Sequence, residues 1–282
     1  MGIKIDGKEL ANRIKLRLKN EVDIIKNNSG KCPKVASILV GNDGGSIFYQ
    51  NSQQKVATSL GIGFDKVNLD ETIEQKDLEN IIINLNNDNN IHGIMLLLPL
   101  PKQIDSKKVT SLINPDKDID CLTDISVGRF YKGEESFIPC TPKSVLTILK
   151  ELNVTLEGKN AVVIGRSDIV GKPVANLLTK GNATVTLCHS RTQNLKTITS
   201  KADILVVAIG KPNFITADFV KEGSVVIDVG TSSLNGKITG DVDTESVLEK
   251  VSLVTPVPGG VGALTTTLLL SNVVEASKKY VY

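Results

Sequence analysis

Histidine, cysteine and long apolar stretches are all scarce in this chain of 282 residues. It has 2 histidines and 4 cysteines, and no two cysteines have C-x-x-C spacing, so we expect no resident metal and reduced, mostly buried thiols. The longest apolar run, at 94–101, is far too short to cross a bilayer. Residues 1–15 carry charges throughout and contain no apolar block of signal-peptide length. These absences predict a soluble, cytoplasmic protein without a membrane partner.

An excess of one charge is also missing. The chain has 33 basic and 31 acidic residues, which gives a formal net charge of +2. Nothing global therefore favours nucleic acid as a partner, and any specificity for anions must come from local clusters. The length is comfortable for two domains.

The first half of the chain alternates between strand-like and helix-like segments. Apolar residues recur at helical spacing near the start, and short apolar runs bounded by turn residues follow. We expect helices at 8–27, 46–60 and 74–86, and strands at 35–40, 64–69 and 93–98. Such alternation predicts βαβ units and a mainly parallel sheet.

The second half alternates in the same way. We expect strands at 161–165, 184–188, 204–210 and 224–230, and helices at 143–151, 170–180, 193–201 and 263–279. Continuous Val/Ile runs of this kind suit strands covered on both faces. The predicted fold is therefore α/β, with an N-terminal substrate domain at 1–140 and a Rossmann-like domain at 141–262. We expect the last helix, within 263–282, to pack back on the first domain.

The strongest local signal is the segment VVIGRSDIVGKP at 162–173. A hydrophobic strand runs into Gly165, Arg166 and Ser167, and a helix begins close to a second glycine, Gly171. Glycine allows close approach of a pyrophosphate, and a helix N-terminus offers free N–H groups. The spacing differs from G-x-G-x-x-G, so an ordinary βα turn is the alternative.

Acidic residues are absent from 169–202, where an NAD site commonly places Asp or Glu at the end of the next strand. Ser190 and Arg191 occupy that place, and Arg166 follows the first strand. Arginine and hydroxyl donors suit a 2′-phosphate, so we predict NADP rather than NAD. The alternative is that these groups only solvate a surface.

Six segments spread along the chain resemble, in order, the methylenetetrahydrofolate dehydrogenase/cyclohydrolase family. They are SIFYQNSQQK (46–55), GIMLLLPLP (93–101), PDKDID (115–120), PCTP (139–142), GRSDIVGKP (165–173) and TPVPGGVG (255–262). Dispersed matches of this kind are far more specific than a dinucleotide motif alone.

The resemblance implies a homodimer and a tetrahydrofolate cleft between the two domains. Tyr49 is expected to stack against the pterin or aminobenzoate rings, and Asp120 to accept hydrogen bonds from the pterin. Pro258, Gly259 and Gly260 are expected to form a close-approach loop at the substrate. Taken alone, Tyr49 could be a core aromatic residue and Asp120 a loop cap. Leu100–Pro101 and Val257–Pro258 are candidates for cis peptide bonds.

Two positions depart from the family pattern. Bifunctional members have a catalytic lysine four residues after the tyrosine, where this chain has Gln53. Lys55 is rotated about 200° from that position on a helix and cannot easily substitute. The family usually has a glutamine, the partner of the lysine, where this chain has Leu97.

These departures affect the two reactions of the family differently. Oxidation of the methylene bridge by hydride transfer depends mainly on alignment, whereas hydrolysis of the methenyl product needs proton exchange. Glutamine has no titratable proton. We therefore expect a dehydrogenase with weak or absent cyclohydrolase activity. The alternatives are a fully bifunctional enzyme, a non-catalytic protein that binds folate or NADP, and another NADP dehydrogenase of similar build.

Overall fold

The computed structural model describes residues 2–280, whose backbone divides into two compact units. The six-stranded unit contains residues 2–12 and 139–265, and the three-stranded unit contains residues 13–138 and 266–280. Two of the three boundaries fall within the first and last long helices, and the third lies between residues 138 and 139, just before another helix begins. Every strand pair in the two large sheets is parallel, which confirms the predicted α/β class.

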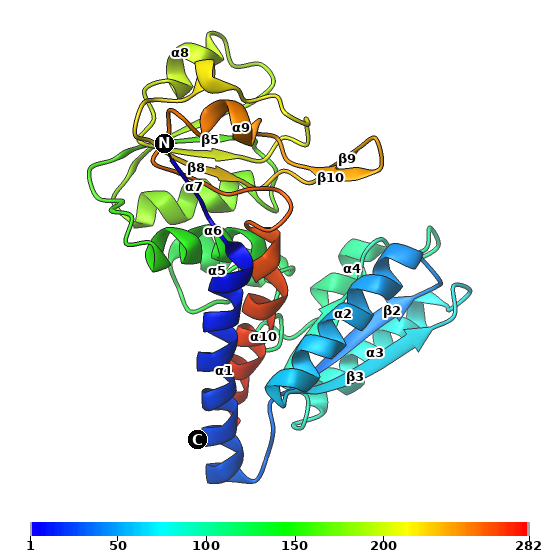
Figure 1. The fold of residues 1–282 in the computed structure, drawn as a ribbon. Helices are drawn as coiled ribbons and strands as arrows, with labels where there is room; N and C mark the ends of the chain where they lie inside the picture. Colours follow the sequence, from blue (N-terminus) through cyan, green and yellow to red (C-terminus); the bar gives the residue numbers. More distant parts are fainter. Residues whose placement is uncertain (1, 281–282) are drawn as a thin grey trace. The chain divides into compact units, whose positions relative to one another are not determined.

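The order of the elements alternates strands and helices through most of the chain (Figure 1). The elements are β1 (Ile3–Lys4), α1 (Gly7–Ser29), β2 (Lys34–Val40), α2 (Gly44–Leu60), β3 (Gly63–Leu69), α3 (Gln75–Asn87), β4 (Gly93–Leu96), α4 (Ser106–Ser111), α5 (Asp124–Lys132), α6 (Cys140–Glu151), β5 (Asn160–Ile164), α7 (Gly171–Lys180), β6 (Thr184–Cys188), α8 (Leu195–Thr199), β7 (Ile204–Val207), η1 (Ala217–Phe219), β8 (Val225–Asp228), β9 (Ser232–Leu234), β10 (Lys237–Thr239), α9 (Thr244–Val247), β11 (Leu253–Val254) and α10 (Gly262–Lys278).

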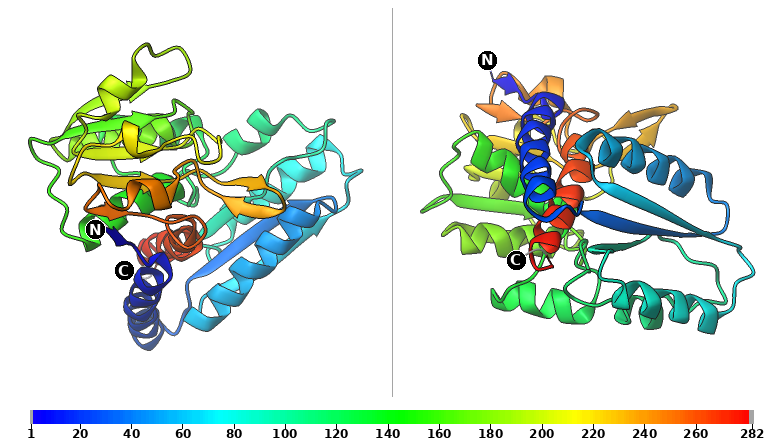
Figure 2. Two further views of the ribbon diagram at one scale, coloured as in Figure 1. Left: turned by 45° about the horizontal axis from the view of Figure 1, so that its top comes forward. Right: turned by 90° about the horizontal axis from the view of Figure 1, so that it is seen from below.

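The sheet of the three-stranded unit has the order β3-β2-β4, so β2 is the central strand. Its side chains alternate between two faces. Ala36, Ile38 and Val40 belong to the buried cluster that contains Leu78 and Ile82 of α3. Ser37 lies on the opposite face and contacts α2, which Figure 2 shows on the other side of the sheet from α3.

Helix α2 has defined signals at both ends. The Asp43 carboxylate accepts a hydrogen bond from the backbone N–H of Ser46 at 2.7 Å, which satisfies one free donor of the first turn. Gly61 ends the helix in the left-handed conformation, with φ of 76°. The buried face of α2 follows helical spacing and consists of Ser46, Gln50, Gln53, Ala57 and Leu60.

The sheet of the six-stranded unit has the order β1-β11-β8-β7-β5-β6. Its central strands β7 and β8 are buried along their whole length, as their continuous Val/Ile sequences predict. One face carries a cluster that includes Val162, Leu205 and Val226. The carboxyl ends of β6, β5 and β7 are neighbours at one edge of the sheet, where α/β proteins bind ligands.

Most predicted elements are present within two residues of their expected ends, but the strands at 93–98 and 204–210 stop earlier, at Leu96 and Val207. The Val257–Pro258 bond is cis as expected. The expectation for Leu100–Pro101 is wrong, because the other cis bond is Leu98–Pro99. Both prolines follow a leucine, so residue type alone did not distinguish them.

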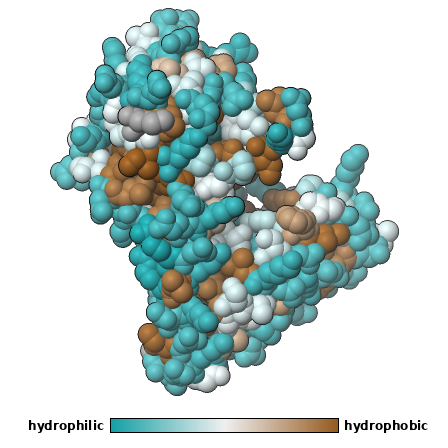
Figure 3. Space-filling model, viewed as in Figure 1, coloured by the Kyte–Doolittle hydropathy of each residue, from teal (hydrophilic) through white to brown (hydrophobic). Residues whose placement is uncertain are grey.

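The surface seen in Figure 3 is mostly hydrophilic, with hydrophobic residues in separate small patches. The two most exposed large apolar side chains among residues 2–280 are Phe48, at 77%, and Ile169, at 73%. Isolated residues of this kind are ordinary on protein surfaces and do not mark a site by themselves. No helix in the described part of the chain has both the length and the apolar composition needed to span a bilayer.

Candidate functional site

The turn after β5 is built so that only glycine fits at two positions. Gly165 has φ of 121°, and a Cβ there would lie 2.2 Å from the carbonyl oxygen of Ala208. A Cβ on Gly171 would lie 2.0 Å from the carbonyl oxygen of Gly165. The chain therefore folds back on itself at the N-terminus of α7. The two glycines thus allow close packing of backbone on backbone in this turn, while the predicted approach of a pyrophosphate stays a prediction.

A pocket of about 480 Å³ lies beside this turn, at the carboxyl ends of β5, β6 and β7. A volume of this order is typical of small-molecule sites. The lining residues are Ile164, Gly165, Arg166, His189, Ser190, Thr192, Leu195, Ala208, Ile209, Lys211 and Phe214. Three residues predicted from the sequence, Gly165, Arg166 and Ser190, are therefore brought together.

Three other predicted cofactor residues do not line the pocket, namely Ser167, Gly171 and Arg191. Arg191 is the neighbour of Ser190, and its backbone N–H donates to Nδ1 of His189 at 3.1 Å. Ser167 lies in the turn, where its hydroxyl oxygen accepts hydrogen bonds from the N–H groups of Val170 and Gly171 at 3.2 and 3.3 Å. Ser167 therefore stabilises the turn, and the N–H group of Gly171 already donates a hydrogen bond to it.

Lys211 and Phe214 line the pocket but are not among the residues predicted from the sequence. Both lie in the segment GKPNF that follows β7. The signal was present, because carboxyl ends of adjacent parallel strands meet at one edge and the loop after β7 must therefore lie beside the turn after β5. The loop after β7 could be placed beside the turn after β5 only once it was known that β7 pairs with β5.

Two buried carboxylates hold the loop after β7. Asp241 accepts hydrogen bonds from the backbone N–H groups of Ile209, Gly210 and Lys211 at 2.6, 3.0 and 2.6 Å. Asp228 accepts from Gly230, Asp241 and Val242. Both aspartates are fully buried. The loop that carries Lys211 is therefore fixed by its backbone, which leaves the lysine side chain available.

Asp228 is the group in this region whose titration has a consequence for stability. Burial, with a smaller contribution from the charge of Asp241, raises the pKa of Asp228 to about 6 even though three N–H groups favour the carboxylate. The unfolded pKa is about 3.9, so the folded state binds the proton more tightly. The stabilisation is complete below the unfolded pKa and is lost as pH rises through the folded pKa.

We therefore expect the free energy of unfolding of the wild type, relative to Asp228→Asn, to increase by about 1 kcal/mol between about pH 7.5 and about pH 5. Urea unfolding of both proteins at the two pH values measures this difference. The asparagine variant removes the titrating group and serves as the reference. If the difference in free energy of unfolding between the two proteins stays constant or becomes smaller at the lower pH, the raised pKa of Asp228 is contradicted.

In the three-stranded unit, α2 carries two predicted site residues one turn apart. Tyr49 is partly exposed, at 41%, whereas Gln53 is completely buried. Neither Nε2 nor Oε1 of Gln53 has a hydrogen-bond partner among the described residues. Buried amides are nearly always paired. The unpaired amide therefore marks the position where the family resemblance places a catalytic lysine.

Leu97 follows β4 and extends the ladder with β2, because its backbone N–H donates to the carbonyl oxygen of Ile38 at 3.0 Å. Its side chain is buried, at 7% exposed. A leucine side chain offers no hydrogen bond, so Leu97 cannot satisfy the amide of Gln53.

Asp120 is half-buried in a loop whose shape is set by its neighbours. The carboxylate of Asp118 accepts from the N–H groups of Leu122 and Thr123, each at 2.8 Å. The side chain of Asn272 in α10 donates to the carbonyl oxygen of Ile119 at 2.7 Å. The carboxylate of Asp118 therefore stabilises this loop, and both readings of Asp120 stay predictions.

The predicted substrate loop Pro258–Gly260 belongs to the six-stranded unit, whereas Tyr49, Gln53, Leu97 and Asp120 belong to the three-stranded unit. Within its unit the loop packs closely on the start of α1. The N–H of Gly7 donates to the carbonyl oxygen of Gly259 at 2.9 Å, and a Cβ on Gly7 would lie 2.3 Å from the carbonyl oxygen of Gly260. Gly259 has φ of 101°, which favours glycine.

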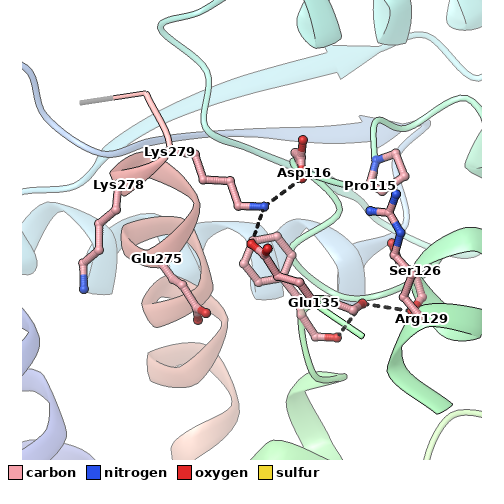
Figure 4. A pocket seen from close by; sticks show the side chains of 10 residues that line it. Pro115, Asp116, Ser126, Arg129, Glu135, Glu275, Lys278 and Lys279 are labelled. Carbon is pink, nitrogen blue, oxygen red and sulfur yellow. Dashed lines mark hydrogen bonds and ion pairs between the residues drawn. The ribbon is translucent and has the colours of Figure 1, made fainter. Parts of the chain in front are cut away.

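A second pocket, of about 200 Å³, lies in the three-stranded unit between α5, α10 and the loops near 115 and 135 (Figure 4). Figure 4 shows Lys279 directed at Asp116 and Glu135, and its Nζ lies 2.8 Å from each carboxylate. None of the predicted substrate residues lines this pocket. The charge of Lys279 is already neutralised by Asp116 and Glu135, so we assign this pocket no part in the predicted chemistry.

Two family models match the chain. The model for the tetrahydrofolate dehydrogenase/cyclohydrolase catalytic domain matches residues 5–120, and the model for the NAD(P)-binding domain of the same enzymes matches residues 139–281. The chain belongs to the tetrahydrofolate dehydrogenase/cyclohydrolase family. The resemblance inferred from the six sequence segments is thereby confirmed, and the pocket beside Gly165 lies in the NAD(P)-binding domain.

Relatives of this family match over nearly the whole chain. The bifunctional protein FolD of Clostridium botulinum (strain Alaska E43) is 60% identical over 280 residues, which cover 99% of each protein. The crystal structure of FolD from Campylobacter jejuni has a TM-score of 0.95 at 42% identity and covers 99% of both chains. The Trypanosoma brucei enzyme, solved with NADP and an inhibitor, has a TM-score of 0.91 at 35% identity and covers 99% of this chain and 98% of its own.

Proposed function

We propose that this protein oxidises methylenetetrahydrofolate by hydride transfer to NADP and also hydrolyses the methenyl product. The observation that carries the first activity is the glycine turn at Gly165 and Gly171 beside a pocket in the NAD(P)-binding domain. The residues fit a dinucleotide, because the two glycines let the turn pack closely against the backbone at Ala208 and Gly165 and the pocket lies directly beside this turn. The match to the catalytic-domain model supports the folate substrate.

NADP is preferred to NAD because of the charges around the pocket. Arg166 lines it, Arg191 adjoins it, and neither arginine forms an ion pair with a carboxylate in residues 2–280. No Asp or Glu lines the pocket to accept hydrogen bonds from a ribose 2′-hydroxyl. The Trypanosoma brucei relative was solved with NADP, which supports the same choice.

For the hydride transfer, the protein has to hold the folate so that its methylene carbon faces the acceptor. We propose that the ring of Tyr49 stacks on the folate and that the Asp120 carboxylate accepts hydrogen bonds from the pterin. Bound NADP supplies the hydride acceptor. The methenyl cation left behind is stabilised by its own two nitrogen atoms, so no side chain needs to exchange a proton in this step.

The expectation of weak or absent hydrolysis gains no support from the comparisons, because relatives at 60% identity are named bifunctional. The bifunctional alternative fits better, and we propose it for this chain. Gln53 cannot replace a lysine as an acid or a base. Its unpaired carboxamide can instead accept a hydrogen bond from a water whose oxygen attacks the methenyl carbon, and the proton that this water releases passes to a solvent water. Solvent water then returns a proton to the ring nitrogen as the bond between that nitrogen and the carbon breaks.

An assay with purified protein, methylenetetrahydrofolate and either NADP or NAD tests both activities. We expect reduced nicotinamide to form faster with NADP, while the methenyl absorbance stays well below the amount of reduced nicotinamide. Equal accumulation of both species over many turnovers would show that hydrolysis is lost. Binding of folate and NADP without any reduced nicotinamide would favour the non-catalytic alternative.

We also propose that the protein is a homodimer, as the family resemblance implies. The edge strand β6 supports this, because it lies at one end of the sheet with Leu187 exposed at 36%. A second copy that covers this edge would bury its unpaired backbone groups. Light scattering coupled to size-exclusion chromatography should give twice the monomer mass, and a monomer at micromolar concentration contradicts the proposal.

A cytoplasmic location is the last part of the proposal. The four cysteines are free, and Cys121, Cys140 and Cys188 are buried, which suits a reducing compartment. Cell fractionation with an antibody against the chain tests this location.

A further inference from the structure

Lys211 lies where a dinucleotide of the proposed kind carries its distinguishing group. It lines the same pocket as Ser190, which follows β6, the second strand of the βαβ unit. In Rossmann folds the end of this strand contacts the 2′-position of the adenosine ribose. Lys211 approaches that region from the loop after β7, a separate part of the chain.

The ammonium of Lys211 is available for an anion. The side chain is exposed, and its Nζ has no carboxylate within ion-pair distance among residues 2–280. The Nζ atom lies over the ring of Phe214, 5.4 Å from the ring centroid. Lys196, on α8, differs, because its Nζ lies 3.2 Å from the carboxylate of Asp218.

The backbone beneath Lys211 is held in place by a buried group. The carboxylate of Asp241 binds the N–H groups of Ile209, Gly210 and Lys211, and a Cβ on Gly230 would lie 2.2 Å from that carboxylate. The loop therefore has little freedom to withdraw. A lysine on a fixed base loses less freedom when it binds an anion than a lysine on a mobile loop.

We propose that Lys211 binds the 2′-phosphate of NADP and that Asp241 is the residue that positions it. This inference rests on the proposed use of NADP and adds a third cationic residue to Arg166 and Arg191. The ammonium acts as a point charge on the phosphate dianion. Phe214 limits the directions that the lysine side chain can take.

The test compares two ligands that differ only in the 2′-phosphate, adenosine 2′,5′-bisphosphate and adenosine 5′-monophosphate. Isothermal titration calorimetry on the full-length protein, without folate, gives both dissociation constants. We expect Lys211→Met to weaken binding of the bisphosphate by about tenfold to a hundredfold, the range for a charge-assisted hydrogen bond. Binding of the monophosphate should change less than about twofold, because it lacks the group that Lys211 contacts.

Matched variants keep the result interpretable. Lys196→Met removes the same charge outside the pocket and should leave both affinities unchanged, while Lys211→Arg should keep most of the preference for the bisphosphate. A wild type that binds both ligands equally refutes the proposed use of NADP. The role of Lys211 alone is overturned if the wild type prefers the bisphosphate and Lys211→Met keeps the same preference. It is also overturned if Lys211→Met weakens binding of both ligands by the same factor.

Discussion

Replacing Gln53 by leucine is expected to stabilise the protein and, in the same variant, to slow hydrolysis of methenyltetrahydrofolate. The amide is completely buried and neither polar atom has a partner in the described chain. An unsatisfied buried polar group costs about 1–3 kcal/mol, and leucine of similar size removes that cost. We therefore expect the free energy of unfolding to rise by about 1–3 kcal/mol in the absence of ligands.

The catalytic effect has the opposite sign because the amide is proposed to orient the attacking water. Loss of one fixed hydrogen-bonding group at a reacting centre commonly reduces turnover by about a hundredfold or more. Hydride transfer does not use that water, so the dehydrogenase rate should stay within about threefold of the wild type. Urea unfolding and separate assays of the two reactions measure the three quantities.

Gln50 supplies a matched control on the same helix. It is also buried, but its Nε2 donates to the carbonyl oxygen and the hydroxyl of Ser37 at 3.1 and 3.2 Å. Gln50→Leu removes both hydrogen bonds, one of them to the buried Ser37 hydroxyl, and should therefore destabilise the protein by about 1–3 kcal/mol. If Gln53→Leu and Gln50→Leu lower the free energy of unfolding by similar amounts, the Gln53 amide has a hydrogen-bond partner in solution. Unchanged hydrolysis in Gln53→Leu would remove the residue from the mechanism.

Adding one methyl group to Gly171 is expected to damage both stability and cofactor binding. The new Cβ would lie 2.0 Å from the carbonyl oxygen of Gly165, and a backbone atom cannot move aside as a flexible side chain can. Overpacking of this kind costs about 1–3 kcal/mol or more, and the displaced turn should weaken NADPH binding by about tenfold or more. Urea unfolding and NADPH fluorescence titration measure the two effects.

Gly128→Ala makes the same chemical change where there is space. Gly128 lies inside α5, and nothing is within 4 Å of the position that its Cβ would take. Alanine is a better helix former than glycine by about 1 kcal/mol, so this variant should gain stability and bind NADPH normally. If Gly171→Ala behaves like Gly128→Ala, the turn at Gly165 is more tolerant than its geometry indicates.

The sequence predicted all three strands of the smaller sheet and four of the six strands of the larger one, because short strand-like runs alternate with helical patterns along the chain. It did not predict the hairpin of β9 and β10, although Asn235 and Gly236 at its turn both have positive φ and form a known hairpin signal. Helix α5, with only nine residues, was also missed. The two-residue strand β1 has no local signal, since its pairing with β11 depends on contacts distant in sequence.

The candidate site divides in a similar way. The helical period placed Tyr49 and Gln53 one turn apart on α2, and the motif placed Gly165 and Arg166 at the pocket. The complete burial of Gln53 with both polar atoms unpaired could not be predicted, because it depends on what surrounds the helix. Lys211 needed the strand order, which the sequence pattern did not provide.

The pairing of β1 with β11 has a consequence for how the molecule is made. Ile3 is synthesised about 250 residues before its partner Leu253, which is a delay of tens of seconds at about 5–20 residues per second. The three-stranded unit also needs residues that are synthesised late, because the side chain of Asn272 in α10 donates a hydrogen bond to the carbonyl oxygen of Ile119. Neither unit can be completed cotranslationally from an uninterrupted stretch of chain, so a prematurely terminated product leaves both of them unfinished.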